Sequence, residues 1–330
     1  MLSTIDTHTA AGPTRIITAG TPRLYGESIK EKMHYFQQHY DNFRQLLMHE
    51  PRGHKDMWGA VLAEPSHPDA DVGAFFINAN GYLPACVHSA IGVATAGLKT
   101  GFIEQPSNKG KNKIVMEIPA GLISLTPNYL NDQLQSISLQ TAPAFVEQQE
   151  VIIPLNCGRN IAICIVFSGV FFALVDMQQL GKNLSTSESI DYLRATALEL
   201  LDKLNNNIKI VHPENPMANA IAMLMFYEEI SENHSRDIVF STKGNIDRSP
   251  CGAGTGARIT QLHSQGRLDI KQNYQLESFL GSQFHGEVVG LDQVGQYPAT
   301  IPQITGSAYI TGMHNFVLEQ NDPLKKGFIF

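Results

Sequence analysis

Short apolar segments rich in β-branched and aromatic residues recur along the chain and predict β-strands. The predicted strands are Thr14–Thr18, Val72–Ile77, Ile114–Ile118, Leu122–Thr126, Ile161–Phe167, Val170–Val175 and Ile238–Phe240. The longest apolar stretch, Ile161 to Val175, has 15 residues and is interrupted by Ser168 and Gly169. A membrane-spanning helix needs about 20 residues. We therefore expect two buried strands joined by a turn there.

Two longer segments have apolar residues spaced by three or four, which is typical of one face of a helix. The first is Tyr25–Met48 and the second is Ser185–Asn206. In the second, Ser185 is followed three residues later by Glu188, the spacing of a capping box. Each half of the chain thus contains one long amphipathic helix.

Two of the cysteines are separated by half the length of the chain. Cys86 and Cys251 are 165 residues apart, half of the 330-residue length, and each follows a turn that contains proline. Each opens a segment of small residues, CVHSAIGVATAG and CGAGTGA. A helix of Gly, Ala, Ser and Thr suits a place where other elements wrap around it closely. The sequence therefore predicts two similar halves, each with a cysteine at the start of a buried helix.

A thiol at a helix N-terminus is favoured as thiolate, because the dipole and the unpaired N–H groups there stabilise negative charge. The same N–H groups can bind the carboxylate of a ligand. Two such helices would place one sulfur on either side of a bound anion. This arrangement suits removal of a proton from one face of a carbon and its return to the other.

Other roles for these cysteines stay open at this point. A buried cysteine is often a small hydrophobic residue, and this is the expected role of Cys157 and Cys164. Cys86, His88 and Cys251 with another histidine could bind zinc, although no C-x-x-C pair supports it. A disulfide between Cys86 and Cys251 would require oxidising conditions.

Length and charge narrow the class of protein. A chain of 330 residues suggests two domains. The net charge of −7 argues against a nucleic-acid partner, whose binders present a basic face. The N-terminal residues contain no basic segment followed by an apolar one, so the expected location is cytoplasmic, with no membrane association.

Several motifs together resemble the proline racemase superfamily, which comprises cofactor-independent racemases, epimerases and dehydratases of proline and hydroxyprolines. The resemblance covers nearly the whole chain, and its most specific string is DRSPCG at 247–252. The matching segments are Ile5–Thr9 with Pro13–Arg15, Glu50–His54 with Asp56, Met57 and Gly59, Asn80–Tyr82 before Cys86 and His88, Asp247–Gly252 with Gly254 and Thr255, Tyr297–Pro298, Ile301–Pro302, Ile304–Ala308, and Gly312 with Phe316.

The resemblance implies an α/β (α+β) fold of the diaminopimelate-epimerase type. Two pseudo-symmetric halves would each wrap a sheet around a central helix, with the active site in the cleft between them. The N-terminal half would comprise residues 1–146 and 316–330, and the C-terminal half residues 147–315. Many members look dimeric, so a homodimer is compatible with this assignment.

The resemblance also implies site residues. Cys86 and Cys251 would be the two acid/base residues, and His88 and Asp247 would support them. Backbone N–H groups near Val87, His88, Gly252 and Ala253 would bind the substrate carboxylate. The substrate would be a small imino acid, and neither a cofactor nor a metal would be needed.

The choice of reaction rests on the second cysteine. Dehydratases of trans-3-hydroxy-L-proline carry threonine at that position, whereas Cys251 favours a two-base inversion. The sequence predicts a 4-hydroxyproline 2-epimerase, with a proline racemase as the alternative. A dehydratase and a non-catalytic imino-acid-binding protein are further alternatives.

The substrate contacts depart in part from the family pattern. Val87 and Ser89 stand where the family usually has glycine, Ala253 replaces a common threonine, and Gly12 replaces a common acidic residue. Ser89 could recognise a ring hydroxyl, which favours hydroxyproline, or could pack in the first helical turn. Two aromatic residues, Phe240 and Tyr82, are expected beside the substrate ring; for both, the alternative is a place in the core.

Overall fold

The computed structural model of the protein describes residues 1–184 and 190–329. The chain forms two compact units, Met1–Leu139 with Gly306–Phe330, and Gln140–Thr305. The borders expected from the sequence, 146/147 and 315/316, fall inside strands β9 (Ala144–Pro154) and β18 (Ala308–Phe316). The borders of the compact units lie a few residues before these two strands, at 139/140 and 305/306.

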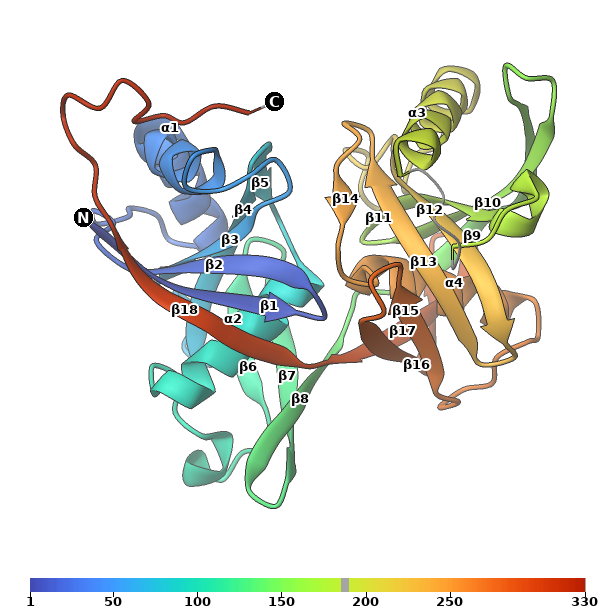
Figure 1. Ribbon diagram of the computed structural model, residues 1–330. Coiled ribbons are helices and arrows are strands. Elements are labelled where there is room, and N and C mark those ends of the chain that lie inside the picture. The colour runs from blue at the N-terminus through green and yellow to red at the C-terminus, as the bar shows by residue number, and fades with distance from the viewer. Residues whose placement is uncertain (185–189, 330) are drawn as a thin grey trace. The chain divides into compact units, whose positions relative to one another are not determined.

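The first unit is a mixed sheet with two main helices (Figure 1). Its strands pair in the order β18-β1-β2-β3-β4-β6-β7-β8, and β5 adds to β4. The pairs β2–β3 and β4–β6 are parallel, and the others are antiparallel. The elements are β1 (Leu2–Thr9), β2 (Gly12–Ala19), α1 (Ile29–Met48), β3 (Trp58–Ala63), β4 (Val72–Asn78), β5 (Gly81–Leu83), α2 (Val87–Thr100), η1 (Pro106–Lys109), β6 (Ile114–Ile118), β7 (Gly121–Leu130), β8 (Gln133–Gln140) and β18.

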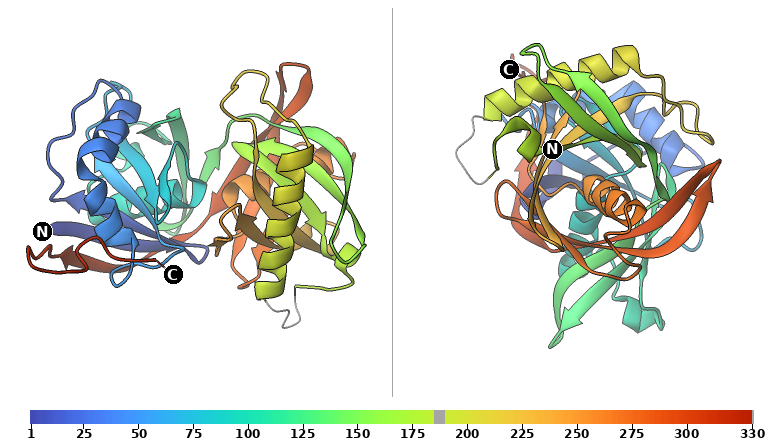
Figure 2. Two further views of the ribbon diagram at one scale, coloured as in Figure 1. Left: turned by 90° about the horizontal axis from the view of Figure 1, so that it is seen from above. Right: turned by 90° about the vertical axis from the view of Figure 1, so that its right-hand side faces the viewer.

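The second unit is a sheet that closes on itself. Its strands pair in the order β9-β10-β11-β12-β13-β15-β16-β17 and β17 returns to β9, while β14 adds to β13. The right-hand view of Figure 2 shows the orange helix α4 inside this ring. The elements are β9, β10 (Asn160–Ser168), β11 (Val170–Asp176), η2 (Met177–Leu180), α3 (Ile190–Asn207), β12 (Ile221–Ser231), β13 (His234–Ser241), β14 (Ile246–Asp247), α4 (Gly252–Ser264), β15 (Tyr274–Ser278), β16 (Gln283–Val294) and β17 (Tyr297–Gly306).

The two units repeat one pattern of pairing. In each unit, an antiparallel hairpin (β1–β2 or β10–β11) is followed by a long helix (α1 or α3) and then by a second antiparallel hairpin (β3–β4 or β12–β13). The last strand of the first hairpin pairs in parallel with the first strand of the second. A very short strand, β5 or β14, then precedes the helix that begins after a cysteine, α2 or α4. The prediction of two similar halves from the cysteine spacing is therefore confirmed at the level of topology.

Each sheet has helices on both faces, which explains why its strands are apolar throughout. On β4, Phe75 and Ile77 pack in the cluster that contains α1, whereas Ala74 and Phe76 pack in the cluster that contains α2. Side chains along β11 divide in the same way between α3 and α4. Because successive residues of a strand point to opposite faces, both sets of positions must be apolar.

The predicted strands all occur, and Ser168–Gly169 forms the turn between β10 and β11. The first predicted helix begins at Ile29 instead of Tyr25, because Ser28 caps it by accepting a hydrogen bond from the Glu31 N–H. The capping box expected at Ser185 and Glu188 lies outside the described residues. Of the helices within the described ranges, none is long and apolar enough to cross a membrane.

The small residues of α2 and α4 let the strands approach these helices closely. A Cβ atom on Gly92 would lie 2.7 Å from Thr7 Oγ1 of β1, and one on Gly256 would lie 2.6 Å from Ser168 Oγ of β10. Such distances are shorter than a real side chain tolerates. The crowding that the sequence predicted around the two cysteine helices is therefore present.

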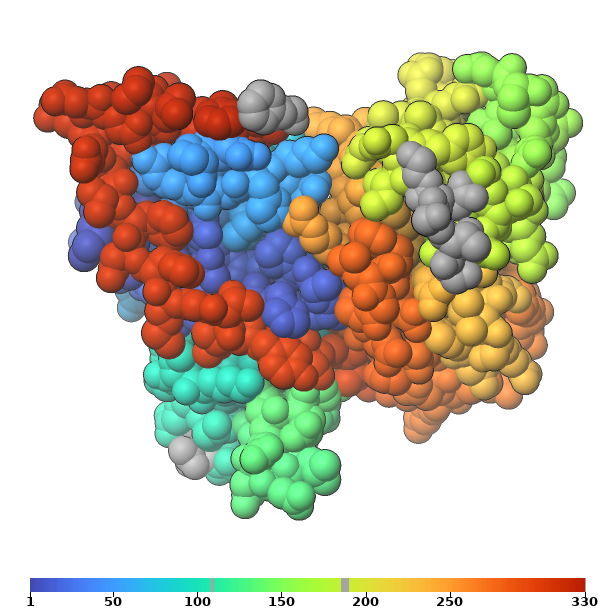
Figure 3. Space-filling view, viewed as in Figure 1, coloured from blue at the N-terminus to red at the C-terminus, as the bar shows by residue number. Residues whose placement is uncertain are grey.

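Hydrogen bonds hold the loop from Glu50 to His54 in place. Arg15 donates hydrogen bonds to the carbonyls of Leu47 and Arg52 while pairing with Asp6 at 2.8 Å. Glu50 exchanges two backbone hydrogen bonds of 3.0 Å with Phe328. Figure 3 shows the C-terminal segment, in red, lying against the light-blue residues of this unit. The C-terminal segment thus fixes the end of α1.

The β1–β2 hairpin contains a backbone conformation that its residues disfavour. Ala10 and Ala11, between the paired Thr9 and Gly12, both have positive φ (46° and 72°), as the central residues of a type I′ turn do. We expect Ala10→Asn with Ala11→Gly to raise the free energy of unfolding by about 1 kcal/mol, because Asn and Gly tolerate this conformation. Urea unfolding followed by circular dichroism measures the change.

The β7–β8 hairpin supplies the matched control. Asn131 and Asp132 also have positive φ (49° and 60°) at its centre, so replacing both with alanine should lower stability by a similar amount. Equal stability of the wild type and the double variant with Ala10→Asn and Ala11→Gly would contradict the argument.

Candidate active site

Cys86 is the residue that starts α2. It is half-buried, its φ and ψ (−156° and 115°) are extended, and its side chain makes no capping bond to the helix backbone. Its carbonyl accepts the N–H of Ala90, the first hydrogen bond of the helix. The N–H groups of the first helical turn have no carbonyl partner within the helix. Cys86 therefore stands where the backbone stabilises negative charge.

The Cys86 thiol has two polar neighbours in the first turn of its own helix. Ser89 Oγ lies 3.2 Å from Cys86 Sγ, and His88 Nδ1 lies 3.5 Å from it. Ser89 is completely buried, and its Oγ also lies 3.1 Å from Thr14 Oγ1 of β2. We call Cys86, His88, Ser89 and Thr14 the Cys86 site.

The strands hold His88 firmly. Thr9 Oγ1 of β1 donates a 2.7 Å hydrogen bond to the His88 carbonyl. The edge of the Trp58 ring packs against the imidazole at a centroid distance of 5.0 Å. His88 is only 3% exposed. Trp58 thus helps to fix the ring that lies beside the thiol.

Cys251 starts α4, as Cys86 starts α2, but it is more deeply buried, with 6% exposure. Its Sγ accepts a hydrogen bond of 3.3 Å from the Gly254 N–H. Its φ is +53°, a left-handed value that is uncommon outside glycine. Such conformations persist where the surrounding structure enforces them, and they gather at functional sites.

The Asp247 carboxylate organises the turn before Cys251. Its Oδ1 accepts hydrogen bonds from the Ser249 N–H at 2.9 Å and from Ser249 Oγ at 2.8 Å. Ser249 Oγ in turn accepts the Cys251 N–H at 3.2 Å. The Thr255 hydroxyl anchors the first turn of α4 by donating to the carbonyl of Cys251 at 3.0 Å.

Burial raises the pKa of the Cys251 thiol well above its usual range, and the neighbouring carboxylates of Asp247 and Asp237 add to the rise, whereas the hydrogen bond from Gly254 opposes it. Asp237 lies on β13 and is completely buried. Neither of its carboxyl oxygens has a hydrogen-bond partner. Burial, with the charge of Asp247, raises the pKa of Asp237 as well. We call Cys251, Asp247, Ser249 and Asp237 the Cys251 site.

The two cysteines occupy equivalent positions, but their polar neighbours differ. Both sulfurs sit at the N-terminus of a buried helix, so the helix dipole acts on each in the same sense. A serine hydroxyl, to which the thiol donates, and an imidazole lie beside Cys86, whereas carboxyl groups lie beside Cys251. Burial and these carboxyl groups therefore favour the neutral thiol at Cys251.

Of the ten predicted site residues, eight lie in one or other of these two regions. Val87, His88 and Ser89 form the first turn of α2 beside Cys86, and Gly252 and Ala253 begin α4 after Cys251, with Asp247 just before. The sequence did not predict Thr14 or Asp237. The signal for Asp237 was an acidic residue adjoining the apolar strand residues Ile238–Phe240.

The structure does not support ring contacts from the two predicted aromatic residues. Phe240 is completely buried in the core cluster of α3, 6.2 Å from the Phe226 ring, because its position on β13 points to the outer face. Tyr82 instead donates a 2.7 Å hydrogen bond to Asp41 of α1.

Two further cysteines were expected to be buried hydrophobic residues. Cys164 is buried on β10, as predicted, whereas Cys157 is exposed in the turn between β9 and β10. The expectation for Cys157 was therefore wrong.

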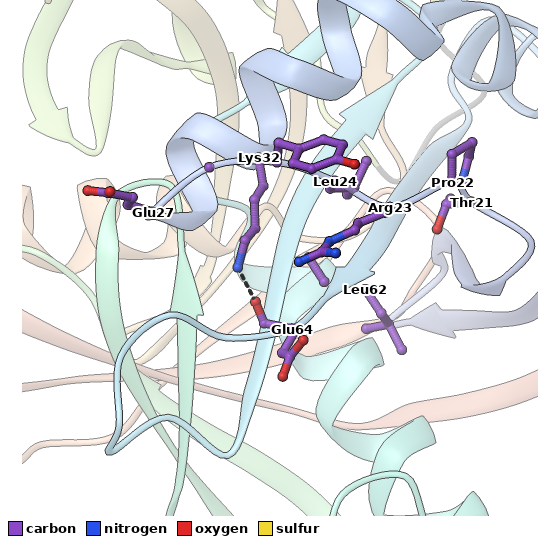
Figure 4. A pocket seen from close by; sticks show the side chains of 11 residues that line it. Thr21, Pro22, Arg23, Leu24, Glu27, Lys32, Leu62 and Glu64 are labelled. Carbon is purple, nitrogen blue, oxygen red and sulfur yellow. Dashed lines mark hydrogen bonds between the residues drawn. The ribbon is translucent and has the colours of Figure 1, made fainter.

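A pocket of about 500 Å³ opens elsewhere in the first unit, between the segment before α1 and the end of β3 (Figure 4). It contains none of the predicted site residues. The Lys32 ammonium that points into it already donates to the Glu64 carbonyl and to Ser66 Oγ. We assign this pocket no role.

The buried Asp237 carboxyl makes stability depend on pH. In the unfolded chain this carboxyl loses its proton at about pH 4, the ordinary value for aspartate. In the folded chain the raised pKa means that it keeps the proton to higher pH. The folded state therefore loses stability as pH rises above about 4. We expect Asp237→Asn to raise the free energy of unfolding at pH 7 by about 1 kcal/mol or more, with the gain shrinking toward pH 4.

Urea titrations at several pH values measure this difference. The exposed carboxylate Asp69, whose side chain is 80% exposed, supplies the control, and Asp69→Asn should give no such trend. A gain from Asp237→Asn that is equal at pH 4 and pH 7 would contradict the buried neutral acid.

Comparison with known proteins gives matches that extend over nearly the whole chain. The family described as "Proline racemase" matches residues 4–329. A proline racemase of Acetoanaerobium sticklandii is 37% identical over 98% of this chain and 97% of its own. A trans-3-hydroxy-L-proline dehydratase of Bacillus cereus is 32% identical over 99% and 97%. The crystal structure of a hydroxyproline epimerase from Agrobacterium vitis, with bound trans-4-hydroxy-L-proline, superposes with a TM-score of 0.88 at 28% identity, covering 100% of this chain and 94% of that one.

These findings confirm both the fold class and the family inferred from the motifs. The mixed α/β architecture is that of the diaminopimelate-epimerase-like folds. The chain belongs to the proline racemase family and is an isomerase of the racemase and epimerase type.

Proposed function

We propose that the protein inverts the α-carbon of proline by a two-base reaction that uses the thiols of Cys86 and Cys251 and no cofactor. A thiolate takes the α-proton and becomes a thiol, leaving a carbanion. The other thiol gives its proton to the opposite face of that carbon and becomes a thiolate. The proposal requires both sulfurs to reach the same α-carbon.

The observation that carries the proposal is the repeated placement of a cysteine at the start of a buried helix of small residues. Proton transfer is most efficient when the acid/base group has a pKa near the working pH, and a thiol at a helix N-terminus can meet this need. The unpaired N–H groups in the same first turns provide a place for a carboxylate.

The electrostatics of the two sites support a starting assignment. Because burial and nearby carboxyl groups raise the pKa of Cys251, we assign Cys251 as the resting thiol and proton donor. Cys86, beside His88 and Ser89, is assigned as the resting thiolate and proton acceptor. The roles exchange in the reverse direction, as microscopic reversibility demands.

The α-proton of an imino acid is very weakly acidic, so the carbanion must be stabilised strongly. We propose that the N–H groups of Val87, His88, Gly252 and Ala253 bind the substrate carboxylate, which can accept part of the developing charge. Fixed N–H dipoles stabilise such charge without reorganising, which makes them effective in a site with little water.

The structure weakens the reason for preferring hydroxyproline. That preference rested on the Ser89 hydroxyl, but Ser89 is completely buried and its Oγ faces Cys86 and Thr14. The relative from A. sticklandii, at 37% identity, is a proline racemase. We therefore propose L-proline as the first candidate substrate. The likeness to an epimerase structure that holds trans-4-hydroxy-L-proline keeps 4-hydroxyproline 2-epimerase as the second.

A dehydratase of trans-3-hydroxy-L-proline is less well supported, although one such relative is 32% identical. The resemblance implies threonine at the second position in dehydratases, and Cys251 is present here. A binding protein without activity is also less well supported, because both thiols keep polar neighbours suited to proton transfer.

Proton NMR in D₂O tests the reaction and the substrate together. Reduced protein is incubated separately with L-proline, trans-4-hydroxy-L-proline and trans-3-hydroxy-L-proline. We expect loss of the α-proton signal and racemisation with L-proline. Preferred exchange with trans-4-hydroxy-L-proline, giving the cis-4-hydroxy-D-proline spectrum, would select the epimerase instead. Loss of the 3-hydroxyl would select the dehydratase.

Two variants test the assignment of the bases. Cys86→Ala and Cys251→Ala should each lower kcat for inversion by a factor of about 1,000 or more, since each removes one of two required acid/base groups. Cys157→Ala, at the exposed cysteine, is the matched control and should retain full activity. Inversion at the wild-type rate in either single variant would contradict the two-thiol mechanism.

A further inference from the structure

The Cys86 site contains a chain of buried hydroxyl groups that the reaction as proposed does not use. Thr14 Oγ1 lies 3.1 Å from Ser89 Oγ, which lies 3.2 Å from Cys86 Sγ. Thr14 and Ser89 both have no exposed surface. The backbone of β2 holds this end of the chain, because the Thr14 carbonyl accepts a hydrogen bond from Thr7 Oγ1 at 3.3 Å.

Such a chain can reverse its direction. When Cys86 is a thiol, its S–H donates to Ser89 Oγ, and the Ser89 hydroxyl donates to Thr14 Oγ1. When Cys86 is a thiolate, the Thr14 hydroxyl donates to Ser89 Oγ, and the Ser89 hydroxyl donates to sulfur. Each hydroxyl oxygen therefore takes part in a hydrogen bond in both states, which lowers the cost of burying either form of the thiol.

We propose that Ser89 is a positioning residue that stabilises the Cys86 thiolate through a reversible hydroxyl chain ending at Thr14. This inference deepens the proposed function, since it explains how one of its two bases is held ready as thiolate. At the Cys251 site the sulfur instead accepts from the Gly254 N–H, a donor that cannot reverse. A hydroxyl that can either donate to the sulfur or accept from it can stabilise both forms of Cys86, which must act as base and as acid in the proposed reaction.

Other titratable groups near α2 must be held constant in any test. On the helix itself, His88 faces the thiol. The strands packed on α2 carry Asp6 and Arg15, which pair with each other, His8, which stacks on Tyr309, and His314, which lies 3.7 Å from Asp6. A buried carboxyl, Asp56, precedes β3. Substitutions of Ser89 and Thr14 leave all of these charges in place.

The test is the pH dependence of cysteine alkylation in the protein without substrate. Iodoacetamide reacts with thiolate, so the rate at each cysteine, followed by peptide mass spectrometry from pH 5 to pH 10, reports its ionisation. The exposed Cys157 serves as the reference thiol in the same sample. We expect Ser89→Ala to raise the pH midpoint for Cys86 by about one unit. Thr14→Val should raise it by less, and the Cys157 midpoint should stay unchanged.

Two further variants separate the hydroxyl from its surroundings. Ser89→Gly should give the same upward shift as Ser89→Ala if the hydroxyl matters and side-chain volume does not. Thr300→Val removes one member of another buried hydroxyl pair, 2.7 Å from Thr260 Oγ1 in the second unit, and should leave the Cys86 midpoint unchanged. Circular dichroism and thermal unfolding establish that each variant is folded.

The acid limb of the kcat/KM profile for inversion provides a second readout, and it should move upward with the alkylation midpoint. A Cys86 midpoint that shifts no more in Ser89→Ala than in Thr300→Val would overturn the proposal. Loss of activity in Ser89→Ala with an unchanged midpoint would also overturn it, because Ser89 would then act on the substrate or on packing. If wild-type protein inverts none of the imino acids but the midpoint shifts as expected, the proposed function fails and the hydroxyl chain stands.

Discussion

The close wrapping of a sheet around a helix of small side chains is the constraint on which each unit of this protein depends. At Gly92 and Gly256 even one methyl group would overlap a strand side chain. A helix buried in this way presents its N-terminus as one of its few polar surfaces. Because Cys86 and Cys251 occupy that position, the packing that builds each core also sets the electrostatic environment of each thiol.

The same wrapping explains the composition of the strands. A sheet with α2 or α4 on one face and α1 or α3 on the other exposes neither face fully to water. Its strands must be apolar at successive positions, as at Phe75 and Phe76. Where α2 begins, buried polar side chains are paired: Thr9 bonds to the His88 carbonyl, and Thr14 and Ser89 bond to each other and to the thiol.

The two units show how one topology can surround two cysteines with different polar groups. Their ladders repeat strand by strand, so the helix dipole acts on both cysteines alike. The difference lies in a few side chains: Ser89 and His88 beside Cys86, and Asp247 beside Cys251. Unlike neighbours on a repeated scaffold therefore place the two thiols in different electrostatic surroundings.

The sequence by itself determined the family, the fold class, the repeated halves and the two thiols, because these rest on local patterns: apolar runs, small-residue segments and the DRSPCG string. Only the tertiary structure decided where side chains point. Phe240 and Ile238 could face either side of their strand until the packing of α3 was known, and Tyr82 turned to Asp41 of a distant helix. Ser89 contacts Thr14, and Asp237 lies near Asp247, because long-range strand pairing brings together residues that no local pattern relates.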